Sequence, residues 1–256
     1  MTDTTAPPPE PLAGRTFRGR SLRGARFIGC DLGDVVVRGS DLAGLELDSP
    51  WLLEGGATLV VNGVDVVGFV DAELDRRFPG RALRTAEDAP GLVAAWDALE
   101  RTWAATVARA QSLPDGSVSQ SVDGEWSFTQ TLRHLVVATD VWFGRAILGL
   151  SDPFHPLGLP DDSGSDVFAA ARFTDADPAL ADVLDARADR QGQVRAFLAG
   201  VTDAQLAEER PNPHAPEHSE TVLSCLRTIL EEEWDHHRYA VRDLDRVASG
   251  AQEGAA

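Results

Sequence analysis

The clearest structural signal in the sequence is residues 223–244, which read Leu-Ser-Cys-Leu-Arg-Thr-Ile-Leu-Glu-Glu-Glu-Trp-Asp-His-His-Arg-Tyr-Ala-Val-Arg-Asp-Leu. Apolar side chains recur along it with the period of an α-helix, at Leu223, Leu226, Leu230, Val241 and Leu244. Glu233 and His237 fall on the same stripe, four residues apart, so the helix brings a carboxylate and an imidazole together on its inward face. Burying this pair without compensation would cost on the order of several kcal/mol. A divalent cation held by both side chains is one form of compensation.

A third candidate ligand lies on an earlier predicted helix. Residues 124–135 read Gly-Glu-Trp-Ser-Phe-Thr-Gln-Thr-Leu-Arg-His-Leu. Ser127 and Gln130 fit a capping box, which predicts that a helix begins there, and His134 follows among its apolar residues. A histidine in such a place is more often a core or edge residue than a ligand. Because the later helix carries a carboxylate–imidazole pair, we interpret His134 as a third metal ligand instead.

His134, Glu233 and His237 together make a set of two histidines and one carboxylate with open positions. Such a set is typical of catalytic metal sites, whereas structural zinc sites are closed by four protein ligands. We therefore predict a divalent-metal site at these three residues. His236 is rotated from His237 by about 100° around the helix. It is predicted to lie at the edge of the bundle, and it would replace Glu233 or His237 as a ligand if the helix phase differed.

Other polar residues near these ligands have less specific roles. Glu231 and Glu232 do not share the ligand stripe, which favours a solvated acidic face. Asp140 and Arg238 are candidates either to orient a ligand or to form an ion pair within the bundle. Cys225 lies about two turns from the acidic ligand, so a core role is favoured over a nucleophilic one. The sequence indicates no general base.

The remaining helical patterns complete a bundle. Long amphipathic segments are predicted at 89–112, 127–148, 177–200 and 219–247, with shorter helices at 68–77 and 203–209. Four long amphipathic helices joined by loops predict an antiparallel four-helix bundle. Asn62-Gly63 separates two apolar runs within residues 58–67, which predicts a β-hairpin.

A different period governs the N-terminal region. An apolar residue recurs every five positions, at Leu12, Phe17, Leu22, Phe27, Leu32, Val37, Leu42 and Leu47. Neither a helix nor a strand has this period, and fixed-period self-similarity is the signature of a solenoid. Residues 10–49 resemble pentapeptide-repeat proteins, which implies a short right-handed β-helix. Eight such centres make only about two coils, too few for an independent stack.

This repeat segment is interpreted as a structural appendage or a dimer surface. The alternative, mimicry of DNA, requires a strong negative field, and the arginines of the segment oppose it. The predicted fold is thus mainly α. We divide the chain into five segments: a disordered tail (1–9), the pentapeptide-repeat-like segment (10–50), a hairpin and short helix (51–88), the four-helix bundle (89–248) and a second disordered tail (249–256).

Composition excludes several classes of function. The formal net charge of −18 argues against a nucleic-acid binder, which needs clustered cations. The absence of lysine excludes Schiff-base and P-loop chemistry. No apolar run is long enough to span a bilayer, and the N-terminal residues do not read as a secretory signal. The two cysteines lie in regions of different predicted fold, which favours a reducing cytoplasm over a disulfide framework.

Residues 124–135 and 231–244 resemble the DinB-like superfamily of four-helix bundles, and the resemblance covers about 90–248. Members bind a divalent metal through a histidine on the second helix and a His-x-x-x-His pair on the fourth. Carried over to this sequence, those positions are His134, Glu233 and His237. This chain departs from the pattern because Glu233 stands where many relatives have histidine, so Zn, Ni, Mn and Fe are not distinguished.

The same resemblance implies a function. The DinB-like superfamily includes metal-dependent thiol transferases and isomerases that use a low-molecular-weight thiol such as mycothiol or bacillithiol. We therefore expect a metal-dependent S-transferase or isomerase with a thiol cosubstrate and a small-molecule substrate. The alternative is a non-catalytic interaction or scaffold protein that uses the repeat segment, forms homodimers and holds a structural metal or none.

Overall fold

The computed structural model describes residues 12–53, 55–161, 166–168, 171–174 and 176–253. The chain forms two compact units, Met1–Asp48 and Ser49–Ala256, and each is described by itself. The predicted tail at 1–9 lies outside the described residues, as do the last residues of the predicted tail at 249–256. Residues 249–253 instead belong to the final helix, because its helical hydrogen bonding continues past the end of the predicted pattern.

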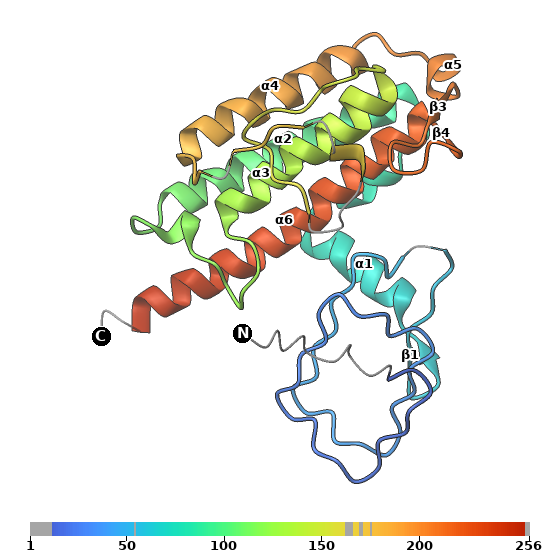
Figure 1. Ribbon diagram of the computed structural model, residues 1–256, viewed down its shortest axis with the longest axis vertical. Helices are drawn as coiled ribbons and strands as arrows, with labels where there is room; N and C mark the ends of the chain where they lie inside the picture. Colours follow the sequence, from blue (N-terminus) through green and yellow to red (C-terminus); the bar gives the residue numbers. More distant parts are fainter. Residues whose placement is uncertain (1–11, 54, 162–165, 169–170, 175, 254–256) are drawn as a thin grey trace, which may run out of the picture. The chain divides into compact units, whose positions relative to one another are not determined.

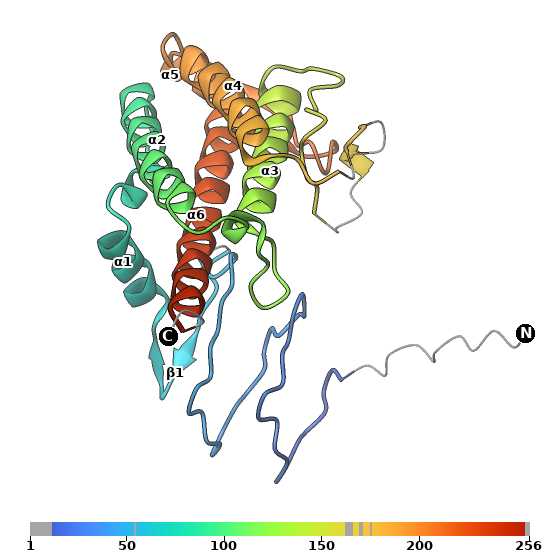
Figure 2. The same ribbon diagram turned by 90° about the vertical axis from the view of Figure 1, so that its left-hand side faces the viewer.

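The first unit is a coil of regular turns without strands. Backbone hydrogen bonds close a turn at every tenth residue, from the amides of Arg15, Ala25, Val35 and Leu45 to the carbonyls three residues before them, at 2.9–3.2 Å. Positive φ angles recur every five residues, mostly at glycine. Figure 1 looks along this coil, and Figure 2 shows it from the side. No strand lies within residues 12–48, so the closed β-helix expected from the repeat is not what the structure shows.

The second unit begins with the predicted hairpin. β1 (Val60–Val61) pairs antiparallel with β2 (Val64–Asp65). Asn62 and Gly63 both have positive φ, 52° and 85°, as a tight two-residue hairpin turn requires. The helix expected at 68–77 follows as α1 (Val67–Arg77), and η1 (Arg81–Thr85) connects it to the bundle.

Four long helices form the body of this unit, and the fold is mainly helical (Figures 1 and 2). They are α2 (Ala89–Gln111), α3 (Phe128–Thr139) with its π-helical continuation η3 (Asp140–Ile147), α4 (Leu180–Leu198) and α6 (Val222–Glu253). Smaller elements are η2 (Ser117–Ser119), η4 (Asp166–Phe168), α5 (Asp203–Leu206), β3 (Glu209–Pro211) and β4 (Ser219–Thr221). Buried apolar side chains from all four long helices share one core.

Local sequence explains where the helices begin. Asp88 caps α2 by accepting a hydrogen bond from the Gly91 amide at 2.8 Å. Ser127 and Gln130 form the capping box expected at the start of α3. The predicted start of the last helix was three residues early, because residues 219–221 pair with 209–211 as β4 and β3. This second hairpin also shortens the helix predicted at 203–209.

The second half of the helix predicted at 127–148 is π-helical. π-Helices are rare in proteins, and those that occur are often found at functional sites. Asp140, the first residue of η3, is 2% exposed and accepts hydrogen bonds from the His155 amide at 2.8 Å and from Arg190 Nε at 2.5 Å. The carboxylate therefore anchors the loop after η3 and helix α4. None of the described helices has the length and hydropathy that crossing a membrane would require.

Candidate metal centre

Three side chains from two helices converge at one edge of the bundle. His134 lies on α3, and Glu232 and His236 lie four residues apart on α6. One potential ligand atom from each side chain lies within 4.8 Å of the other two, the only such group of histidine, cysteine or acidic residues found in the described part of the chain. Glu232 Oε2 lies 3.6 Å from His134 Nε2 and 3.4 Å from His236 Nδ1. The donor set is two imidazoles and one carboxylate, which suits a divalent transition metal.

The predicted ligand Glu233 is instead held in an ion pair. Arg187 on α4 donates from Nη1 and Nη2 to the two carboxylate oxygens, at 3.0 and 2.8 Å. The side chains of Glu233 and Arg187 are 1% and 5% exposed. Burial of the carboxylate is thus compensated by a guanidinium from a third helix, and the structure does not place Glu233 beside His134.

The predicted ligand His237 is likewise occupied elsewhere. Its Nε2 lies 2.8 Å from Thr106 Oγ1 on α2, and its Nδ1 is buried without a hydrogen-bond partner. The rings of Phe78, Trp103 and Trp234 surround the imidazole edge-on, with centroids 5.1–5.8 Å away. His237 is a core residue in an aromatic box.

Glu233 and His237 lie outside the converging set for one physical reason. Glu233 and His237 do lie on the inward stripe of α6, as their spacing indicated, and both are at most 3% exposed. Glu233 is paired with Arg187, and His237 Nε2 lies against Thr106 Oγ1 while its Nδ1 has no hydrogen-bond partner. The converging set lies one residue earlier on the helix, where the side chains of Glu232 and His236 are 33% and 15% exposed. The alternative that His236 is a ligand candidate therefore agrees with the geometry.

Neighbouring carbonyls orient both imidazoles. His134 Nδ1 donates to the Leu159 carbonyl at 3.2 Å, and His236 Nδ1 donates to the Glu232 carbonyl at 2.8 Å. In a neutral His134 this leaves Nε2, the atom 3.6 Å from Glu232 Oε2, with a free lone pair, whereas His236 directs Nδ1 at both the carbonyl and the carboxylate of Glu232. Such hydrogen bonds to the second nitrogen are typical of metal-binding histidines.

The loop that supplies the Leu159 carbonyl is pressed onto α3. Buried Arg133 donates to the Leu157 and Thr174 carbonyls, both at 2.9 Å. Gly158 approaches so closely that a Cβ there would lie 2.5 Å from Val137 Cγ2. His134 is therefore held by a fixed backbone acceptor.

Trp126 forms an aromatic wall beside the two imidazoles. Its ring centroid lies 4.6 Å from that of His134 and 6.2 Å from that of His236, and it is nearly parallel to His236 with an interplanar angle of 22°. Trp126 immediately precedes the Ser127 cap, so the start of α3 fixes its position. Sequence reasoning missed this residue, although the indole lies eight positions before the predicted ligand His134.

Burial and mutual contact set the protonation of the cluster. Burial tends to raise the pKa of the Glu232 carboxyl, but the neighbouring His134 and His236 outweigh it and hold the pKa below its ordinary value. Burial, reinforced by His134, lowers the pKa of His236 to about 4. The carboxyl is thus ionised and His236 neutral at pH 7, as metal ligation requires.

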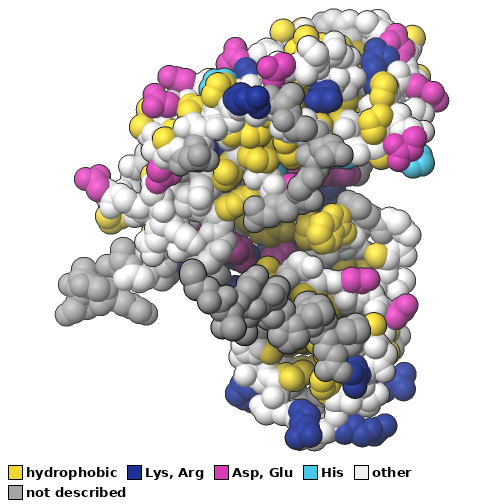
Figure 3. Space-filling view, in the orientation of Figure 1, with side chains coloured by type: hydrophobic (Ala, Val, Ile, Leu, Met, Phe, Trp, Pro, Cys, Tyr) yellow, Lys and Arg dark blue, Asp and Glu magenta, His cyan; other side chains and the backbone are white. Residues whose placement is uncertain are grey.

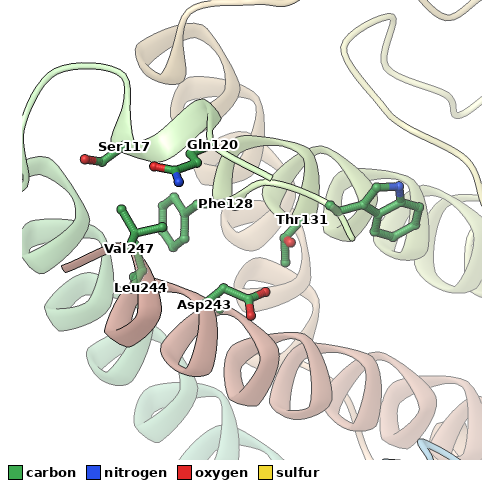
Figure 4. A pocket seen from close by; sticks show the side chains of 9 residues that line it. Ser117, Gln120, Phe128, Thr131, Asp243, Leu244 and Val247 are labelled. Carbon is green, nitrogen blue, oxygen red and sulfur yellow. The ribbon is translucent and has the colours of Figure 1, made fainter. Parts of the chain in front are cut away.

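Two hollows lie in this unit, and Trp126 lines the first of them. The one in Figure 4, between η2, the start of α3 and the end of α6, has a volume of only about 10 Å³, room for one water rather than a substrate. A wider cleft of about 590 Å³ lies between the end of η3 and the β3–β4 hairpin. This volume suits a small molecule. None of the three converging side chains lines either hollow.

The model of the DinB superfamily matches residues 98–240, more than half of the chain. The chain belongs to the DinB superfamily. Neither a curated protein nor a solved structure matches it. The matched region includes His134, Glu232 and His236, so the converging set lies inside the DinB-superfamily part of the chain.

The other candidate residues of this DinB-superfamily protein have structural partners. Asp140 holds Arg190 and the His155 amide rather than a ligand imidazole. Arg238 lies over the Tyr239 ring, 4.4 Å from its centroid. Cys225 is fully buried, and burial raises its pKa to about 11, which agrees with a core role and opposes a nucleophilic one.

The buried imidazole predicts how the stability of this DinB-superfamily protein depends on pH. Burial lowers the pKa of His237 to about 4 from an ordinary 6.5. Between these values the unfolded chain binds the proton and the folded chain does not, so stability falls as pH decreases from 6.5 towards 4. This group alone accounts for up to roughly 3 kcal/mol of the loss.

The measurement is urea unfolding with chelator present across this pH range. His237→Gln, which does not titrate, is expected to show a shallower loss than the wild type. His218→Gln is the control, because the His218 side chain is 73% exposed and its removal is expected to leave the pH profile unchanged. Equal profiles for wild type and His237→Gln would refute this account of the imidazole.

Proposed function

We propose that the protein binds a divalent metal at His134, Glu232 and His236 and uses it as a thiol-dependent S-transferase or isomerase of the mycothiol or bacillithiol type. The observation that supports this proposal is the convergence of three ligand atoms within 4.8 Å at a partly exposed edge of a DinB-superfamily bundle. An edge position leaves room for a cosubstrate beside the protein ligands.

The donor set fits this chemistry. Two neutral imidazoles and one carboxylate carry a single negative charge, so a divalent ion in the site keeps one positive charge. When bound, the metal supplies a positive centre that lowers the pKa of a thiol and favours its thiolate. Zn, Ni, Mn and Fe remain alternatives, because this donor set suits each of them.

In this proposal, neighbouring residues orient the two imidazoles and shield them from water. The Leu159 and Glu232 carbonyls fix the tautomer and orientation of the two imidazoles through their Nδ1 atoms. Trp126 covers one side of both rings and limits the approach of water there. No residue is assigned as a general base.

The test combines metal analysis with an assay. The protein purified without chelator is expected to carry about one equivalent of divalent metal and to catalyse the reaction of mycothiol or bacillithiol with a small electrophile such as a chlorodinitrobenzene. His134→Ala is expected to lose both properties. Stoichiometric metal binding without thiol-dependent turnover would support the metal site and exclude the transferase function.

A non-catalytic role is the second candidate, favoured by the apolar side chains exposed along the coil of the first unit. In that case the metal would be structural and closed by a fourth protein ligand. Asp161 is the neighbour to examine, since its charge acts on the pKa of Glu232. X-ray absorption of the metal-loaded protein distinguishes the two candidates: four protein ligands favour the structural role, and three with an exchangeable ligand favour the enzyme.

The aromatic wall gives an optical test of where the metal binds. A paramagnetic ion such as Cu²⁺ held beside His134 is expected to quench Trp126 strongly, because the two ring centroids are 4.6 Å apart. Trp126→Phe is expected to remove most of the metal-dependent quenching. Trp51→Phe is the control, since Trp51 is 65% exposed and lies far from the cluster in sequence. Equal quenching in both variants would place the metal elsewhere.

A further inference from the structure

The coil of the first unit divides into two rings of opposite charge. We define the first ring as residues 12–31 and the second as residues 32–48, each turn comprising up to four five-residue steps. The ion pair between Arg23 Nη2 and Asp41 Oδ2, at 3.3 Å, joins residues 18 positions apart and shows that successive turns lie against one another. The two rings are therefore stacked within one copy.

The apolar side chains at the repeat centres of both rings are poorly shielded from solvent. All eight repeat centres, from Leu12 to Leu47, are between 43% and 61% exposed. Stacked repeats bury such side chains between neighbours, and a pair of turns can cover each ring on one side only. A row of half-exposed leucine, phenylalanine and valine side chains forms an exposed apolar surface, which is typical of an interaction site.

The charges of the two rings are complementary. The first ring carries five arginines and one acidic residue, namely Arg15, Arg18, Arg20, Arg23, Arg26 and Asp31. The second ring carries one arginine and four acidic residues, namely Asp34, Arg38, Asp41, Glu46 and Asp48. Arginine side chains, dark blue in Figure 3, gather along the lower rim of this unit. Two first rings, or two second rings, would repel each other when stacked.

We propose that the coil is a self-association surface on which the second ring of one copy stacks on the first ring of the next. This contact repeats between copies the pairing of basic and acidic rings that already exists within each copy, represented by Arg23–Asp41. It also covers the repeat centres that a single copy leaves exposed. The arrangement is head-to-tail, so it adds copies in a row rather than closing a symmetric dimer.

The test uses two charge-reversal variants of the full chain. One is Arg18→Glu with Arg20→Glu on the first ring, and the other is Glu46→Arg with Asp48→Arg on the second ring. In sedimentation velocity at low salt, the wild type is expected to form dimers and larger species as its concentration rises, and to dissociate in high salt. Each variant alone is expected to associate at least about tenfold more weakly.

Mixing the two variants distinguishes a loss of charge complementarity between rings from damage to the coil itself. An equimolar mixture of the two variants is expected to associate again, because each retains or acquires a ring that complements the other. Far-ultraviolet circular dichroism checks that both bundles remain folded. A wild type that stays monomeric at all concentrations and salts would overturn the proposal, as would variants that self-associate like the wild type or fail to associate when mixed.

Discussion

Replacing His236 by alanine is expected to abolish binding of a divalent metal, whereas the same change at His237 is expected to leave it. His236 lies with His134 and Glu232 in the converging set, while His237 faces Thr106 inside an aromatic box. Loss of one of three ligands is expected to weaken affinity by at least about 100-fold, since removal of even an outer partner of a ligand typically costs 10–100-fold. Isothermal titration with Zn²⁺ measures the difference.

Comparing His236→Ala with His237→Ala also controls for effects of the substitutions on folding. The His237→Ala variant loses a buried side chain, so it is the less stable of the two and yet the one expected to keep the metal. Stability is measured separately by urea unfolding with chelator present. If His237→Ala lost the metal while remaining folded and His236→Ala retained it, the assignment of the site would be reversed.

Replacing Glu233 by glutamine is expected to destabilise the fold by about 3–5 kcal/mol, because Arg187 would be left as a buried charge without its carboxylate. The pair makes two hydrogen bonds and both side chains are almost completely buried. Urea unfolding in chelator measures the change in the free energy of unfolding.

The same substitution one residue earlier is the matched control. Glu232→Gln is expected to cost less than about 1 kcal/mol, because its side chain is 33% exposed and its contacts are to histidines. It is expected instead to weaken metal binding. Replacing both Arg187 and Glu233 by methionine should restore much of the stability lost in Glu233→Gln. A mild effect of Glu233→Gln, no larger than that of Glu232→Gln, would contradict the structural role of this ion pair.

Most of the helical architecture could be predicted from local signals. The Asp88 cap, the Ser127 capping box and the Asn62-Gly63 turn each have a strong short-range cause, and each occurs in the structure. The β3–β4 hairpin was not predicted, because its short strands lie in a proline-rich stretch with little alternation. The π-helical turn η3 was not predicted either, because its residues continue the apolar pattern of the preceding α-helix.

The site predicted from the sequence and the converging set in the structure differ by one position on the last helix. Two pairs with the same spacing, Glu232–His236 and Glu233–His237, overlap in the sequence, and periodicity correctly assigned the second pair to the inward stripe. The prediction from the sequence equated an inward position on the helix with a metal ligand. The compensating groups Arg187 and Thr106 come from other helices, and a single sequence does not show which side chains those helices direct at α6.

The most direct test is an anomalous diffraction measurement on crystals of the protein grown with Zn²⁺. We expect a single strong anomalous peak among His134 Nε2, the Glu232 carboxylate and the His236 ring, about 2.0–2.2 Å from each ligating atom. A peak beside Glu233 and His237, or a protein that binds no metal while His134, Glu232 and His236 keep the positions described, would contradict it.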